Sequence, residues 1–122
     1  MTTIKNFEDL KAWQKARELA GYVYELTRKD KFSRDFGLRD QIQRAASSAM
    51  HNIAEGFESG SDPEFVRFLK IARRSAGEVQ SQLYLALDVS YIIEDERLKA
   101  HALATEVKRL INGMMTYLRK SD

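Results

Sequence analysis

The segment SDPEFVRFLKIARRSAGEVQSQLYLA, residues 61–86, decides the fold. It opens with Ser61, a good N-cap, followed by Pro63 in the first turn and by Glu64, which can complete a capping box. Apolar side chains then recur every three or four residues and keep to one helical face. These are Phe65, Phe68, Leu69, Ala72, Ala76, Val79, Leu83 and Ala86. The pattern predicts one long amphipathic helix over about residues 62–92.

The scarcity of helix breakers extends this interpretation to the whole chain. One proline and six glycines in 122 residues argue against a sandwich or barrel with many turns. Breakers and polar residues cluster at 29–37, 57–63 and 90–96. They separate four predicted helices, at about 8–29, 37–58, 62–92 and 95–119. Because the connections are short, we expect an all-α protein, an up-down-up-down antiparallel four-helix bundle that forms a single domain over residues 1–122.

Each of the other three helices also has a predicted core face. On the first it consists of Trp13, Ala16, Ala20, Val23, Tyr24 and Thr27. On the second it consists of Leu38, Ile42, Ala45, Ala49, Ile53 and Gly56. On the fourth it consists of Leu103, Val107, Leu110, Ile111, Met114 and Leu118.

The composition excludes several classes of function. There is no cysteine, so neither a disulfide framework nor a thiolate zinc site is expected. The chain has no signal peptide and no long uncharged apolar run, which favours a cytoplasmic protein without membrane contact. Neither His51 nor His101 has a glutamate three residues before it, so the di-iron pattern of helix bundles is missing. No phosphate-binding loop or nucleophile elbow occurs. We therefore expect no enzyme activity, no metal and no cofactor.

Polar residues form a seam along the edge of the second helix's core face: Gln41, Ser48, Asn52 and Glu55. Gln14 of the first helix is expected beside Asn52, close enough for a hydrogen bond between the two amides. This seam has two interpretations. It either fixes the register of neighbouring helices or contributes to a ligand site; buried amides are better known for the first role.

A second apolar stripe runs along the third predicted helix, away from its core face. Its members are Ile71, Leu85, Val89 and Ile92, and on the first helix Leu19 and Leu26 widen the apolar arc in the same way. A monomer would expose these side chains, so the stripe favours a homo-oligomer interface. The alternative is that they are scattered exposed apolar residues, which are common on monomers.

Basic side chains gather on the outer sides of the last two helices. Arg67, Lys70 and Arg74 follow helical spacing on the third, and Lys108, Arg109, Arg119 and Lys120 lie on the fourth. They indicate either a solvated exterior or a surface for RNA or DNA phosphates. The net charge of +2, from 20 basic and 18 acidic residues, favours the former. No exposed aromatic residues are interleaved for base stacking, so any binding would be unspecific.

Three motifs carry a resemblance to a known family. They are DL-x-x-WQ from Asp9, GL-x-x-QI-x-RAA-x-S from Gly37, and NIAEG from Asn52, within a similarity that covers residues 7–93. In this order they resemble the four-helix-bundle proteins encoded in intervening sequences of bacterial 23S ribosomal RNA genes. That family is related in fold to the accessory protein of diversity-generating retroelements, which accompanies a reverse transcriptase.

The resemblance implies a bundle that assembles as a ring, a homopentamer, with RNA or DNA as a further partner. It supplies no catalytic residues. Three functional classes follow. The first is a non-enzymatic homo-oligomeric scaffold or adaptor. The second is a nucleic-acid-binding ring that works with RNA or a reverse transcriptase. The third, a small-molecule pocket, has no support in the sequence.

Overall fold

The computed structural model describes residues 4–120, and all regular structure within that range is helical. The elements are the 3-10 helix η1 (Phe7–Asp9), α1 (Lys11–Thr27), α2 (Asp30–Arg34), α3 (Phe36–Phe57), α4 (Asp62–Asp88) and α5 (Glu94–Lys120). The four long helices were all predicted, and the ends of α3 and α5 lie within one residue of their predicted positions. The short helix α2 was not predicted. The helix predicted from residue 8 is interrupted at Leu10, whose backbone is extended.

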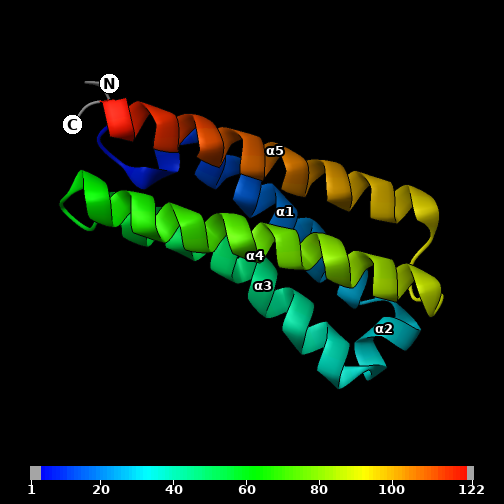
Figure 1. Cartoon of the computed structure of the whole chain (residues 1–122). Helices are drawn as coiled ribbons and strands as arrows, with labels where there is room; N and C mark the ends of the chain where they lie inside the picture. The colour runs from blue at the N-terminus through cyan, green and yellow to red at the C-terminus, as the bar shows by residue number, and fades with distance from the viewer. Residues whose placement is uncertain (1–3, 121–122) are drawn as a thin grey trace.

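The long helices pack around a common core. α3 contacts α4, α4 contacts α5, and α1 lies against both α3 and α5. Figure 1 shows the N- and C-terminal ends of the described chain close together at one end of the bundle, and α2 at the opposite end. We call these the terminal end and the α2 end. The prediction of an all-α fold with four long packed helices is confirmed.

The core face predicted for α3 is correct, because all six of its residues are buried. The face predicted for α1 needs correction. Tyr24 is 41% exposed, whereas Leu19 and Leu26, which we assigned to an oligomer interface, are 0% and 3% exposed. Because α1 packs against two neighbours, its buried arc is wide enough to include both leucines. Leu19 and Leu26 therefore belong to the subunit's own core.

The α4 helix ends four residues earlier than predicted. Ser90 has a positive φ of 65°, and the N–H of Tyr91 donates to the carbonyl of Ala86 at 2.9 Å, as in a Schellman motif. The chain reverses direction here. Ile92 therefore leaves the helical stripe on which we placed it, and it is buried with only 3% exposure. Its assignment to an oligomer interface is wrong.

Side-chain hydrogen bonds cap the first turns of α4 and α5, and an acidic side chain near each helix start also pairs with a basic side chain. Ser61 accepts a hydrogen bond from the N–H of Glu64 at 3.3 Å, so the predicted cap of α4 is confirmed. The carboxylate of Glu64 pairs with Arg67. At α5 the carboxylate of Glu96 accepts from the N–H of Ile93 at 3.0 Å and from Lys29 at 2.7 Å. Burial raises the pKa of Glu96, but the hydrogen bonds from Lys29 and Ile93 outweigh it and leave that pKa lowered.

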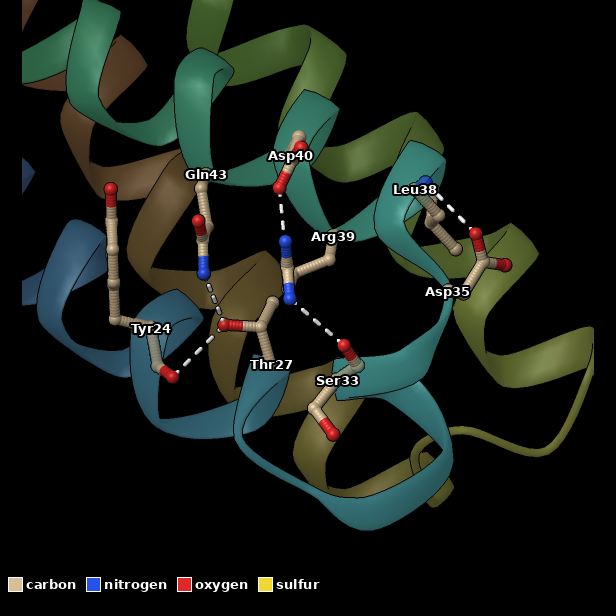
Figure 2. A network of polar contacts seen from close by, with 8 residues as sticks. All are labelled: Tyr24, Thr27, Ser33, Asp35, Leu38, Arg39, Asp40 and Gln43. Carbon is tan, nitrogen blue, oxygen red and sulfur yellow. Dashed lines mark hydrogen bonds and ion pairs between the residues drawn. The ribbon is translucent and has the colours of Figure 1, made fainter.

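A polar network joins α1, α2 and α3 at the α2 end (Figure 2). The hydroxyl of Thr27 donates to the carbonyl of Tyr24 and accepts from the side-chain amide of Gln43 at 2.8 Å. Arg39 donates to the carbonyl of Ser33 at 3.0 Å. Since these bonds connect three consecutive helices, they hold the corner that α2 forms between α1 and α3.

Asp35 links this corner to the turn between α4 and α5. One carboxylate oxygen accepts from the N–H of Leu38 at 3.1 Å and caps α3, and the other accepts from the hydroxyl of Tyr91 at 2.8 Å. The Tyr91 ring stacks on Phe32 with centroids 5.3 Å apart. The hydrogen bond from Leu38, followed by that from Tyr91, lowers the pKa of Asp35 below its ordinary value of 3.8.

Asp35→Asn is expected to weaken the bundle at neutral pH and to reduce its sensitivity to acid. Because the folded pKa is lowered, the charged Asp35 contributes stability that is fully present above pH 3.8 and is lost as the pH falls through the folded value. Thermal unfolding of both proteins between about pH 6 and pH 3 measures this. The difference in melting temperature should shrink on acidification. A constant difference would contradict the proposed role of the charge.

Candidate oligomer interface

A cleft of about 550 Å³ runs along the outer side of α3 and α4, and we call it the α3–α4 groove. The groove is mostly polar, and its lining residues are Gln41, Arg44, Ala45, Ser48, Ser75, Glu78 and Gln82. The alanines of α3 at positions 45, 46 and 49 are buried, and their small side chains let α4 approach closely. The sequence AASSA therefore determines where these two helices meet.

Ser48, Ser75 and Asn52 form a chain of hydrogen bonds along the floor of the groove. The hydroxyls of Ser48 and Ser75 lie 2.8 Å apart and connect α3 to α4. The amide of Asn52 donates to the carbonyl and to the hydroxyl of Ser48, both at 2.9 Å. The predicted bond between Asn52 and Gln14 is wrong. Gln14 is exposed and donates to the carbonyl of Glu8 at 2.8 Å, because the polar edge of α3 faces α4 rather than α1.

Asn52→Ala is expected to cost less than about 1 kcal/mol, because the amide bonds only within its own helix and is only partly buried. The Ser48–Ser75 contact remains available in the variant. Urea unfolding of the two proteins measures the difference. A loss of 2 kcal/mol or more, the size expected for an orphaned buried partner, would mean that Asn52 has a partner outside its own helix.

Gln82 is the unsatisfied member of the groove. Its Oε1 atom is buried and has no hydrogen-bond partner among residues 4–120. A buried amide oxygen without a donor is costly, so native proteins rarely leave one. Gln82 was not among the residues predicted for the seam or the stripe, although it lies one turn before Leu85 on the same side of α4.

The apolar stripe borders the same groove. Leu85 is 50% exposed and Val89 is 45% exposed, and the two lie one turn apart just beyond Gln82. Ile71 is half-buried and lies one turn before Ser75. Of the seam, Gln41 and Ser48 line the groove, Asn52 bonds to its floor, and Glu55 is exposed one turn later. The predicted seam and three members of the predicted stripe therefore share one face.

The α2 end carries most of the large apolar side chains that the described chain exposes. Besides Leu85 and Val89 these are Tyr24, Phe36, Tyr84, Ile93 and Leu98, whereas Tyr117 lies near the terminal end. Our sequence analysis missed Phe36, Tyr84, Ile93 and Leu98. Phe36 and Ile93 lie at helix starts, where a helical wheel gives no guidance. The guanidinium of Arg97 lies 4.5 Å from the ring centroid of Tyr84 and partly covers that ring.

Three of the seven predicted basic residues already have a partner within the subunit. Arg67 pairs with Glu64, Arg109 pairs with Glu106, and Lys108 donates to Gln80 at 2.8 Å. The hydrogen bonds from the two arginines lower the pKa values of Glu64 and Glu106. The remaining four are exposed and have no ion pair or hydrogen bond within residues 4–120. They are Lys70, Arg74, Arg119 and Lys120.

The comparison with protein families identifies the chain. The model of the 23S rRNA-intervening sequence proteins matches residues 8–113. The chain belongs to this family. The resemblance carried by the three sequence motifs is thereby confirmed.

A comparison of structures supports the fold of this family member. Its helices superpose with a TM-score of 0.79 on a crystal structure of a Bacteroides thetaiotaomicron protein of unknown function from the S23 ribosomal protein family. The two chains are 24% identical, and the match covers 86% of this chain and 95% of the other. At this identity the likeness concerns the fold alone. A comparison with curated proteins finds no match.

The described residues contain neither a candidate metal site nor a candidate membrane span. No three acidic, histidine or cysteine side chains between residues 4 and 120 come together in a way that could hold a metal ion. None of the described helices combines the length and the apolar character that are needed to span a membrane. The groove of this family member is lined by hydroxyl, amide and charged side chains together with Ala45.

Proposed function

We propose that this chain is a non-enzymatic, homo-oligomeric scaffold of the cytoplasm, a pentameric ring of up-down-up-down bundles joined through the α3–α4 groove. The observation that carries the proposal is the position of Leu85 and Val89, each about half exposed, next to the polar α3–α4 groove. An exposed apolar pair next to a polar groove is suited to a protein surface that supplies both apolar contact and hydrogen bonds.

A second copy of the chain is the simplest partner for this face. Among the described residues, the groove contains one cation, Arg44, and one anion, Glu78, so its charges can be matched by a different face of the next copy, as a ring requires. Ile71 lies near one end of the polar floor, and Leu85 and Val89 lie at the other. Polar groups between apolar contacts fix the register of two helices, which a closed ring requires.

The test is a pair of charge substitutions on the apolar part of the face. Leu85→Glu with Val89→Glu should reduce the mass of the particle in light scattering to that of one subunit. Helical circular dichroism should persist, because both side chains point away from the subunit's own core. Leu98→Glu is the matched control, since Leu98 is 51% exposed on α5 and lies outside the groove. Parent protein that is already monomeric at micromolar concentration would refute the proposal.

Nucleic-acid binding is a second candidate, favoured by the four exposed cations without an ion pair. In this second proposal the ring contacts RNA or DNA phosphates and works with RNA or a reverse transcriptase. Filter binding of RNA and DNA at two salt concentrations tests this, since each neutralised phosphate adds about 0.7–0.9 to the salt slope. Lys70→Gln with Arg74→Gln should flatten that slope.

Arg67→Gln is the control for this experiment, because Arg67 is already paired with Glu64 and should contribute less to the slope. The particle mass should be the same in all these variants, which separates loss of binding from loss of assembly. Absence of retained RNA and DNA at about 50 mM salt, where phosphate contacts are weakly screened, would leave the basic faces as a solvated exterior.

A further inference from the structure

The terminal end of the bundle contains a second cleft, which differs from the α3–α4 groove in its chemistry. It has a volume of about 640 Å³ and lies between the turn that joins α3 to α4 and the last third of α5. Its walls are largely apolar and come from four parts of the chain, with Leu10, Phe57, Phe65, Leu110, Met114 and Leu118 among them. This volume and this lining are typical of small-molecule sites.

Gly113 leaves one wall of this cleft without a side chain. It lies within α5, where glycine weakens a helix, and a Cβ at this position would meet no atom within 4 Å. Neither a close neighbour nor a positive φ requires glycine there. At Gly56, by contrast, Phe65 and Phe68 occupy the space that a Cβ would need. A Cβ at Gly21 would also meet no atom within 4 Å, but Gly21 does not line this cleft. Gly113 matters because its missing side chain leaves one wall of the cleft open.

The polar groups at the cleft indicate the charge of a ligand. Among the described residues that line the cleft, Arg109 is the one cation and Asp62 the one anion, and the Arg109 side chain is 66% exposed. Its ion pair with Glu106 lies on the surface of the same helix, so solvent screens it and the guanidinium can turn toward another anion. Ser61 already caps α4. Asp62 lies in the first turn of α4, where the helix dipole stabilises its negative charge.

We propose that this cleft binds an aromatic or branched apolar molecule that carries one anionic group. The apolar part lies between Phe57, Phe65 and Met114, and the anion pairs with Arg109 at the rim. Asp62 keeps the anionic group on the α5 side of the cleft. This inference is independent of the oligomer proposed above, since no residue of the α3–α4 groove lines this cleft.

Two fluorescent probes that share one ring system test the inference on the full chain. 8-Anilinonaphthalene-1-sulfonate carries an anion, and N-phenyl-1-naphthylamine is its neutral counterpart. Both should bind saturably, with the sulfonate several-fold tighter, and Arg109→Gln should remove that preference. Gly113→Leu should weaken both by about tenfold or more while the melting temperature stays the same or rises, because the added side chain fills the cleft in an open position.

Controls separate this cleft from the other surfaces. Leu85→Glu with Val89→Glu should leave probe binding unchanged even where it alters the particle mass. Gly113→Ala, the smaller change, should weaken binding only slightly. Absence of saturable binding by the parent, or binding that survives Gly113→Leu in a folded protein, would overturn the inference. So would a change in the particle mass of Gly113→Leu, since it would show that a second copy occupies the cleft.

Discussion

Leu19→Ala is expected to lower the free energy of unfolding by about 2–5 kcal/mol, the usual cost of truncating a fully buried leucine. Leu19 is 0% exposed in a single subunit and lies on the arc of α1 that faces both α3 and α5. The packed helices α1, α3 and α5 cannot collapse easily around the missing side chain, so a cavity would remain. Urea unfolding at low protein concentration, followed by circular dichroism, gives the value.

Leu98→Ala is the control for this measurement, because its side chain is 51% exposed and the change should stay within about 0.5 kcal/mol. The comparison also decides between the two positions that we have considered for Leu19. If Leu19→Ala dissociated the oligomer and left the unfolding free energy of the subunit unchanged, the leucine would belong to an interface, as its sequence pattern first indicated.

Gly56→Ala is expected to destabilise the bundle by about 1–3 kcal/mol through overpacking. A Cβ at this position would lie 2.8 Å from Cδ1 of Phe65 and 2.9 Å from Cβ of Phe68. The half-buried ring of Phe65 can turn aside. Cβ of Phe68, however, is fixed to the backbone of α4 and moves only with that helix. The last turn of α3 must therefore separate from the first turns of α4.

Gly21→Ala provides the matched control within a helix, since a Cβ there would meet no atom within 4 Å. Alanine should stabilise α1 by about 0.5–1 kcal/mol through its higher helix propensity. Thermal and urea unfolding of the two variants should thus shift in opposite directions. Equal shifts would mean that α3 and α4 are not in close contact at Gly56, and that helix propensity alone explains both effects.

The polar seam illustrates how far a helical wheel can predict a site. It correctly grouped Ser48 and Asn52, because both positions follow from the spacing along one helix. It named Gln14 of α1 as the partner of Asn52, whereas Asn52 bonds to Ser48, and it is Ser48 that contacts the next helix, at Ser75 of α4. The identity of a neighbouring helix depends on how α3 is rotated in the bundle, and packing sets this rotation. The unpaired oxygen of Gln82 is likewise a property of burial between two helices.

The fold class, the four long helices and the cap of α4 at Ser61 could all be predicted from the sequence, because they follow from local periodicity and from the hydrogen bonds of single turns. The family could also be predicted from the sequence. The burial of Leu19, Leu26 and Ile92 in the core, by contrast, is seen only in the folded chain. Their burial depends on a helix with two neighbours and on a chain reversal at Ser90, neither of which a single helical wheel contains. The structure likewise united the seam and the stripe into one groove and opened the cleft at Gly113, because both surfaces are formed by residues far apart in the chain.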